Sequence, residues 1–252
     1  MNIPGSIALV TGANRGIGAA FVRALFAQGA AKVYAGSRQS SAAAELVAEF
    51  PGRCHAVELD VTNSAQVAAA ASLCKDVNVL INNAGVFANK LLIGAADMSA
   101  AREEMEVNYF GTLGMCRAFA PVLARNGGGA IVNVLSAAAI VNLPVMGGYG
   151  PSKAAARSLS TGVRAELAEH GTQVTALIVG SVDTRMAAHV AGAKETPDDI
   201  AKAGLRAIKQ GIDEMDTDRM AIEVRANLAL DPKAQERRMA KLLKIPVIST
   251  GK

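Results

Sequence analysis

The chain has 252 residues, of which 51% are hydrophobic and 19% charged, and this balance excludes a disordered chain and a highly charged coiled coil. Aromatic residues make up 4% and tryptophan is absent, so we do not expect a nucleic-acid reader that stacks bases on aromatic rings. The net charge is +4, and the lysine and arginine residues are spread along the chain. This distribution favours a solvated surface of mixed charge, although a basic pocket for a phosphorylated ligand also fits it.

Apolar runs alternate with longer amphipathic stretches along the chain. We predict strands at residues 6–10, 32–36, 54–59, 77–82, 130–135 and 173–179. The helices predicted between and after them span residues 16–28, 42–50, 98–125 (in one or two pieces), 149–170, 196–210, 223–228 and 232–243, with a further helix capped by Asn63. This alternation implies right-handed crossovers and a parallel sheet. We therefore expect an α/β fold, a Rossmann-type doubly wound parallel sheet flanked by helices, and a single domain over residues 1–252.

Three features of the sequence bear on the cellular compartment and on metal or membrane binding. No two cysteines form a C-x-x-C pair, which indicates buried thiols in a reducing compartment: Cys54, Cys74 and Cys116. The histidines have no metal-ligand spacing: His55, His170 and His189. No apolar run reaches the roughly 18 residues of a membrane span, and the first residues lack the basic start of a signal peptide. We expect a cytoplasmic protein with no metal, no membrane partner and no nucleic-acid partner.

A glycine-rich loop lies between the first predicted strand and the first predicted helix. Gly12 allows a sharp turn off the strand, Gly16 lets the backbone approach a phosphate, and Gly18 lets the helix pack closely on the sheet. The free N–H groups at the start of the helix would then face a pyrophosphate. The spacing is G-x-x-x-G-x-G, not G-x-G-x-x-G, and turns use glycine freely, but the position between strand and helix favours dinucleotide binding over a plain turn. The loop residues that we expect at the cofactor are Gly12, Asn14, Arg15, Gly16, Ile17 and Gly18.

No acidic residue ends the second predicted strand. An NAD site usually offers an acid there, which accepts a hydrogen bond from the ribose 2′-hydroxyl. Ser37 and Arg38 follow the strand instead, and Arg38 together with Arg15 would flank a 2′-phosphate, which suits a guanidinium. Two solvated surface arginines are the alternative. The missing acid and the two arginines together favour NADP(H) as cofactor.

Four polar residues of the second half form a candidate catalytic group: Asn108, Ser136, Tyr149 and Lys153. Tyr149 and Lys153 are four residues apart and share one face of the predicted helix. An ammonium near a phenol favours the phenolate, so we predict that Lys153 lowers the pKa of Tyr149 and makes it a proton donor and acceptor near neutral pH. Ser136 ends the fifth strand, where side chains project into the crevice at the carboxyl edge of the sheet. A plain exposed helix face is the alternative.

The motifs together resemble the short-chain dehydrogenase/reductase family. They run in order over most of the chain: Thr11-Gly12-x-x-x-Gly16-Ile17-Gly18, Leu59-Asp60-Val61, Asn82-Asn83-Ala84-Gly85, Val107-Asn108, Ser136 and Tyr149-Gly150-Pro151-Ser152-Lys153. The resemblance implies that Tyr149 is the acid/base on the substrate oxygen. Lys153 would bind the nicotinamide ribose, Ser136 would polarise the carbonyl, and Asn108 would hold a water in a proton relay. Further cofactor contacts are implied for Asp60, Val61, Asn82, Ala84, Gly85, Gly180, Val182 and Thr184.

The sequence departs from the family pattern at two places. Val179 stands where the family usually has proline, although Gly180 keeps the turn. The expected seventh strand, near residues 212–215, is crowded by acidic residues, so we expect it to be short or absent. The apolar loop after Ser136 favours a hydrophobic substrate, or ordinary loop packing, through Ala138, Val141, Leu143, Val145 and Met146, with Met186 and His189 on a further substrate loop.

The resulting functional hypothesis is an NADP(H)-dependent oxidoreductase that interconverts a carbonyl and a secondary alcohol on a small, hydrophobic molecule. A catalytically silent NADP-binding sensor or regulatory subunit is the alternative, although such proteins tend to lose the tyrosine or the lysine. A nucleotide-modifying or methyl-transfer enzyme would share only the glycine loop. The resemblance also implies a homo-tetramer or dimer, paired through helices near residues 100–125 and 150–170.

Overall fold

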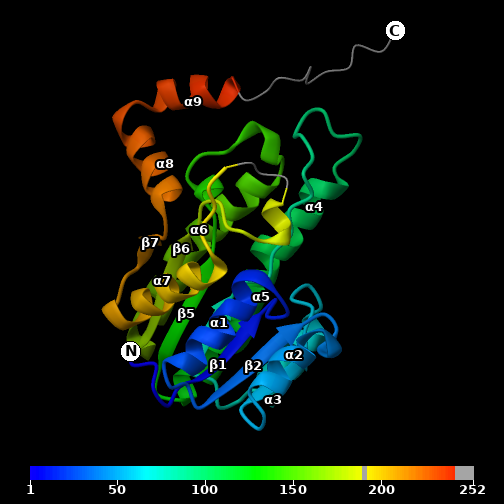
Figure 1. Cartoon of the computed structure of the whole chain (residues 1–252), viewed down its shortest axis with the longest axis vertical. Coiled ribbons are helices and arrows are strands. Elements are labelled where there is room, and N and C mark those ends of the chain that lie inside the picture. Colours follow the sequence, from blue (N-terminus) through cyan, green and yellow to red (C-terminus); the bar gives the residue numbers. More distant parts are fainter. Residues whose placement is uncertain (189–191, 242–252) are drawn as a thin grey trace.

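The computed structural model describes residues 1–188 and 192–241; His189 and the last two residues of the predicted helix 232–243 lie outside this range. Strands and helices alternate along the chain (Figure 1). The strands are β1 (Ile7–Thr11), β2 (Lys32–Ser37), β3 (Cys54–Glu58), β4 (Val79–Asn82), β5 (Gly129–Val134), β6 (Thr172–Ile178) and β7 (Glu214–Asp216). The α-helices are α1 (Gly16–Ala27), α2 (Ala44–Glu49), α3 (Ser64–Leu73), α4 (Ser99–Met105), α5 (Thr112–Arg125), α6 (Tyr149–Leu167), α7 (Pro197–Gln210), α8 (Arg219–Leu230) and α9 (Pro232–Ala240).

The strands form one parallel sheet in the order β3-β2-β1-β4-β5-β6-β7. The direction of winding reverses between β1 and β4, and in such sheets the crevice for a ligand opens at the carboxyl ends of the strands next to this reversal. The doubly wound parallel sheet predicted from the sequence is confirmed. The seventh strand also forms, although it has only three residues and pairs with the end of β6.

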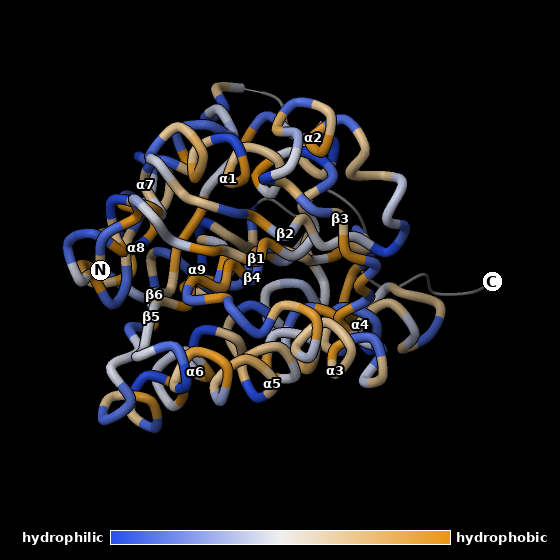
Figure 2. The backbone as a smooth tube through the Cα atoms, turned by 90° about the horizontal axis from the view of Figure 1, so that it is seen from below, coloured by the Kyte–Doolittle hydropathy of each residue, from blue (hydrophilic) through white to orange (hydrophobic). Residues whose placement is uncertain are grey.

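Helices cover both faces of the sheet (Figure 2). Neighbouring residues of the central strands point into different apolar layers: Leu9 and Leu80 into one, Val10 and Ile81 into the other. Strands buried on both faces need apolar residues throughout, which explains the unbroken apolar runs. One layer is completed by Phe21 of α1, Leu46 of α2 and Leu205 of α7. The other layer is completed by Val67 of α3, Phe119 of α5 and Leu167 of α6.

Capping residues set the helix boundaries. The Asn63 side chain accepts hydrogen bonds from the first turn of α3, as predicted, and the Thr196 hydroxyl accepts one from Asp199 at the start of α7. Gly171 and Gly211 follow helical segments with φ of 64° and 67°, in the left-handed region that favours glycine. The predicted helix 223–228 begins earlier, because the Asp218 carboxylate caps α8 at Ala221. Aspartate is a common N-cap residue, so the position of Asp218 could have indicated this earlier start.

The stretch predicted as a helix over residues 98–125 is α4 and α5 joined by a π-helical turn, Glu106–Gly111. π-Turns inside α-helices are rare and often lie at functional sites. Asn108 sits inside this turn.

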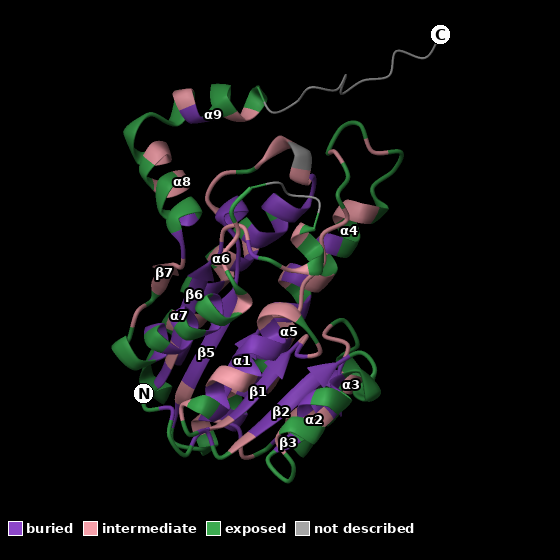
Figure 3. Cartoon of the chain, viewed as in Figure 1, coloured by how far each residue is buried: buried purple, intermediate pink, exposed green. Residues whose placement is uncertain are grey.

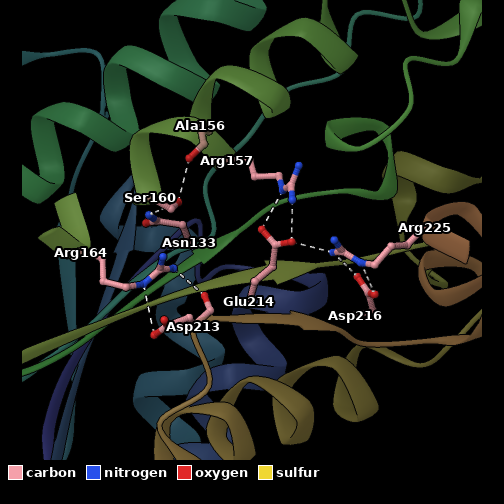
Figure 4. Close-up of polar contacts among 9 residues, drawn as sticks. All are labelled: Asn133, Ala156, Arg157, Ser160, Arg164, Asp213, Glu214, Asp216 and Arg225. Atoms are coloured by element: carbon pink, nitrogen blue, oxygen red, sulfur yellow. Dashed lines mark hydrogen bonds and ion pairs between the residues drawn. The ribbon is translucent and has the colours of Figure 1, made fainter. Parts of the chain in front are cut away.

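Ion pairs connect β7 to helices α6 and α8 (Figure 4). Glu214 pairs with Arg157 of α6 and Arg225 of α8, both at 2.7 Å. Arg225 also pairs with Asp216 at 2.6 Å. Two of the acidic residues that made a seventh strand unlikely from the sequence, Glu214 and Asp216, therefore form ion pairs with arginines of two helices. We call Arg157, Glu214, Asp216 and Arg225 the β7 ion-pair group.

The central strands β1, β4, β5 and β6 are largely buried, whereas α8 and α9 are largely exposed and extend away from the sheet (Figure 3). Over residues 1–188 and 192–241, no helix combines the length and the apolarity needed to cross a bilayer. The same residues contain no group of three or more histidine, cysteine, aspartate or glutamate side chains placed to hold a metal ion.

Candidate active site

A cavity of about 1480 Å³ opens at the carboxyl ends of the strands. Ligand pockets for drug-sized molecules are about 300–1000 Å³, so this cavity has room for a larger ligand such as a dinucleotide. Most of the residues predicted to bind cofactor or substrate line it together: Gly12, Asn14, Arg15, Gly16, Ile17, Ser37, Arg38, Asp60, Val61, Ala84, Gly85, Ser136, Tyr149, Lys153, Gly180, Val182 and Thr184. Gly18, Asn82 and Asn108 lie behind its wall.

The glycine loop shapes one end of the cavity. Gly12 and Gly16 have φ of 63° and 52°, a conformation that other residues seldom adopt. No side chain caps α1 at Arg15, so the N–H groups of the first turn have no partner within the helix and remain available to an anion. Gly18 needs to be glycine for a different reason than the sequence suggested: a Cβ there would collide with the Gly12 carbonyl oxygen and lie 2.6 Å from Nδ2 of Asn83.

Asn83, which was not singled out from the sequence, holds the loop in place. Its Nδ2 donates hydrogen bonds to the carbonyl oxygens of Thr11 and Gly12, at 3.0 and 3.2 Å. The side chain of Asn82, predicted at the cofactor, is 5% exposed and donates to Oδ1 of Asn133 at 2.9 Å. Side chains alternate along a strand, and Asn82 ends β4 on the face of Leu80. This alternation could have revealed the orientation.

The two predicted arginines also lie at the cavity, Arg15 within the glycine loop and Arg38 just after β2. Arg15 and Arg38 are exposed at its rim, and neither makes an ion pair with any part of the chain that the structure describes. Ser37 is buried and its hydroxyl donates to the carbonyl oxygen of Gln39. The Asp60 carboxylate accepts hydrogen bonds from the N–H and the hydroxyl of Thr62.

Tyr149 and Lys153 stand side by side on the first turns of α6. Tyr149 is 9% exposed and Lys153 is 6% exposed. Nζ of Lys153 donates to the carbonyl oxygen of Val134 at 2.9 Å and lies 5.8 Å from the centre of the Tyr149 ring. Ser136 follows β5, is 9% exposed and hydrogen-bonds to Tyr149. The structure therefore brings three of the four predicted catalytic side chains to one stretch of cavity wall.

The prediction that Lys153 lowers the pKa of Tyr149 is wrong. Burial raises the pKa of Tyr149 to about 12; the hydrogen bond from Ser136 opposes this rise, and the charge of Glu104 adds to it. Burial also lowers the pKa of Lys153 to about 8, since the ammonium lies in a poorly solvated place. Helical spacing showed that the two side chains share a face, but their burial and the nearby carboxylate depend on distant segments.

Asn108 is 1% exposed and supports the cavity from behind. Its Oδ1 accepts from the N–H of Val86 at 2.9 Å. Its Nδ2 donates to the carbonyl oxygen of Val86 and to Oγ of Ser152, at 3.0 and 2.9 Å. The side chain thus joins the loop after β4 to helix α6, and the predicted role of Asn108 in a proton relay stays a prediction.

The predicted substrate loop contributes less than expected. Met186 and Val182 line the cavity, but Ala138, Val141, Leu143 and Met146 do not. The side chain of Val145 lies outside the described part of the structure. Phe87, not singled out from the sequence, lines the cavity and packs edge-on against Tyr149, with ring centres 5.3 Å apart and an angle of 63° between the rings.

The sequence profile of the short chain dehydrogenases matches residues 6–195. The chain belongs to this family of oxidoreductases. An uncharacterized oxidoreductase of Staphylococcus saprophyticus is 32% identical to this short chain dehydrogenase over 215 residues, 81% of this chain and 91% of the relative. A crystal structure of a short chain dehydrogenase from Burkholderia cenocepacia in complex with NADP is 45% identical, with a TM-score of 0.90, and the match covers 98% of this chain and 100% of the other. A 3-ketoacyl-(acyl-carrier-protein) reductase from Brucella melitensis complexed with NADH is 25% identical, with a TM-score of 0.78, over 86% of this chain and 96% of the other.

Proposed function

We propose that this short chain dehydrogenase catalyses the NADPH-dependent reduction of a carbonyl compound, or the reverse oxidation of a secondary alcohol. One observation carries the proposal: Ser136, Tyr149 and Lys153 line the same cavity as the glycine loop. A proton donor and a site for a dinucleotide therefore share one space, which is what hydride transfer to a carbonyl requires.

The cavity fits a nicotinamide dinucleotide. A Cβ at Gly16 would lie 3.2 Å from the methyl group of Thr184, which also lines the cavity. The uncapped start of α1 offers N–H groups to a pyrophosphate. Arg15 and Arg38, free of ion pairs with the described residues, would hold a 2′-phosphate. The NADP bound to the relative from Burkholderia cenocepacia supports this choice, whereas the relative from Brucella melitensis binds NADH. The other residues that would hold the cofactor are Gly12, Asn14, Ile17, Ser37, Asp60, Val61, Ala84, Gly85, Lys153, Gly180, Val182 and Thr184.

When bound, NADPH supplies a hydride, and the chain supplies the proton and the geometry. The hydroxyls of Ser136 and Tyr149 would both donate hydrogen bonds to the carbonyl oxygen and stabilise the negative charge that grows on it. With its pKa raised to about 12, Tyr149 is protonated at neutral pH, and it would give its proton to that oxygen as negative charge grows there. Lys153 would hold the nicotinamide ribose and place a positive charge beside the phenolate that remains. This charge stabilises the phenolate until it is protonated again.

The lining of the cavity near Tyr149 supports a small, hydrophobic substrate. Phe87 packs against Tyr149, and Met186 lines the same cavity. Apolar side chains with a few placed polar groups are typical of sites for small organic molecules.

The experiment follows NADPH absorbance with a panel of aldehydes and ketones, comparing wild type with Tyr149→Phe. Turnover with at least one compound is expected, and Tyr149→Phe should lose nearly all of it while NADPH fluorescence titration still shows binding. Unchanged turnover in Tyr149→Phe would refute the mechanism. Binding of NADPH without turnover on a broad panel would favour the silent sensor. Arg38→Asp should weaken NADPH much more than NADH, and an equal loss for both would refute the 2′-phosphate site.

We further propose that residues 1–252 form one cytoplasmic domain that assembles as a homo-tetramer or dimer. Both apolar layers share the single sheet, which supports one domain. Phe110 is 50% exposed beside a shallow groove lined by residues of α3 and α5, the kind of apolar surface that a second copy covers. Light scattering tests the assembly.

A further inference from the structure

Glu104 of α4 is a buried carboxylate for which the proposed mechanism has no use. It is 1% exposed, and its Oε1 accepts a hydrogen bond from the N–H of Ala88 at 2.8 Å. Its Oε2 faces the backbone just before Tyr149, since a Cβ added at Gly148 would lie 2.8 Å from that oxygen. A buried carboxylate is costly to keep unless it makes specific hydrogen bonds, so its place beside the active-site helix calls for an explanation.

The Ala88 contact is one half of a clamp on the segment 86–88. Asn108 exchanges two hydrogen bonds with Val86, one to the N–H and one to the carbonyl oxygen. Glu104 accepts from the N–H of Ala88. The two clamping side chains are four residues apart on α4 and the π-turn and so lie on neighbouring turns. Phe87 is held between the two clamped residues.

The clamped segment carries the Phe87 ring. This ring lines the cavity and meets the Tyr149 ring edge-on, with centres 5.3 Å apart. Edge-to-face pairs at this separation are favourable and directional, so a shift of the backbone at residue 88 would move the ring relative to the phenol. Glu104 lies between the two sides of this pair: it accepts from the Ala88 N–H, and its Oε2 faces Gly148, which precedes Tyr149.

We propose that Glu104 is a positioning residue of the substrate pocket: its carboxylate fixes the Phe87 segment and thereby the wall of the pocket next to Tyr149. The role in substrate binding rests on the proposed function. The clamp itself does not, because it can be measured without any turnover.

The charge of Glu104 gives the proposal a second consequence. The groups that act on the Tyr149 phenol are Ser136 after β5, Glu104 of α4 and Lys153 of α6, whose ammonium lies 5.8 Å from the ring centre. Burial raises the pKa of Glu104, the hydrogen bond from the Ala88 N–H opposes this rise, and the charge of Glu103, next along α4, adds to it. The negative charge of Glu104 opposes formation of the phenolate. Glu104 therefore favours the protonated phenol, the form that donates a proton to a carbonyl.

Two substitutions separate the hydrogen bond from the charge. Glu104→Ala removes the acceptor for the Ala88 N–H and also removes the charge. Glu104→Gln removes the charge and keeps an amide oxygen that can accept from Ala88. Glu103→Gln is the matched control, because Glu103 is exposed, neighbours Glu104 in the sequence and makes no hydrogen bond to the segment 86–88 among the described residues.

The first measurement is hydrogen exchange of the segment 86–89 by mass spectrometry on the full chain. A hydrogen bond to a charged acceptor changes an equilibrium by about tenfold, so Glu104→Ala should exchange this segment about tenfold faster. Glu103→Gln should stay within about twofold of wild type, and Glu104→Gln, whose neutral amide oxygen is a weaker acceptor, should exchange about threefold faster than wild type. Exchange in Glu104→Ala that equals wild type would overturn the clamp. If Glu104→Ala does not fold, a large rise in exchange of this segment in folded Glu104→Gln would overturn it, since that variant keeps the acceptor.

The second measurement uses a carbonyl that the wild type reduces. Glu104→Ala should raise the KM for the carbonyl about tenfold and leave the KM for NADPH within about twofold, because the clamp lies on the substrate side of the cavity. Glu104→Gln should restore the carbonyl KM, because its amide oxygen can accept from the Ala88 N–H in place of the carboxylate oxygen. An unchanged carbonyl KM in Glu104→Ala would overturn the proposal. A wild type that reduces no carbonyl would refute the proposed function, and the exchange measurement would still decide the clamp.

Discussion

Asp218 provides the sharpest test of how the end of β6 is held at the cavity. Its carboxylate is 6% exposed and accepts hydrogen bonds from the N–H groups of Gly180 and Ala221, at 2.6 and 3.0 Å, and from the Thr217 hydroxyl at 2.8 Å. Asp218→Ala would remove the N-terminal cap of α8, at a cost of about 1 kcal/mol. It would also leave the partly buried Gly180 N–H without its acceptor, at about 1–2 kcal/mol. The expected loss of unfolding free energy is therefore about 2–3 kcal/mol, which lowers the melting temperature by about 4–12 °C in a chain of this size.

The assay is chemical and thermal unfolding of Asp218→Ala beside two controls. Thr196→Ala removes a cap of the same kind from α7, where the Thr196 hydroxyl accepts from the Asp199 N–H, and should cost only about 1 kcal/mol. Asp218→Asn keeps an oxygen for Ala221 but turns an amide group toward Gly180, so its loss should fall between the other two. An Asp218→Ala loss no larger than that of Thr196→Ala would show that the Gly180 contact contributes nothing.

Three further predictions concern glycine, lysine and cysteine. Gly18→Ala should weaken NADPH binding by more than about tenfold, because its Cβ collides with the glycine loop. Gly162→Ala in α6, where a Cβ meets nothing within 4 Å, should instead stabilise the protein by up to about 1 kcal/mol. Burial lowers the pKa of Lys153 from 10.5 to about 8, so the folded state binds fewer protons than the unfolded chain between these pH values. The unfolding free energy of the wild type relative to Lys153→Met, measured by chemical unfolding, should therefore rise from pH 8 to pH 9.5 by up to about 2 kcal/mol. A difference that does not change with pH would contradict the buried ammonium. A thiol reagent should label the native protein very slowly and the unfolded protein at three sites, because burial raises the thiol pKa to about 11 for one cysteine and about 12 for two, namely Cys54, Cys74 and Cys116.

The parts of the fold that depend on local pattern could be predicted from the sequence. Apolar runs marked the buried strands, and the position of Gly12 and Gly16 between a strand and a helix predicted the cavity that the structure has. The acids around Glu214 were read correctly as unfavourable for a strand, and β7 is indeed short. It forms because Arg157 and Arg225 come from helices far away in the chain.

The electrostatics of the site could not be predicted in the same way. The spacing of Tyr149 and Lys153 placed both on one helix face, but the sign of the pKa shift of Tyr149 depends on burial by other segments and on Glu104. Asn82 was assigned to the cofactor from a motif, although strand alternation turns it away from the cavity. Asn83, its neighbour in the same motif, makes the contacts with the glycine loop.

The β7 ion-pair group has a practical consequence for protein engineering. Arg157 lies one turn after Lys153 on the helix that carries the tyrosine, and Glu214 joins it to the segment that leads into α8. Grafting the C-terminal third of a relative onto this chain would therefore leave Arg157 facing an unmatched strand unless an acid is retained at position 214. Chimaeras meant to change only α8 and α9 should keep Glu214 and Arg225 together. Otherwise the exchange would also disturb the position of α6, the helix that carries Tyr149.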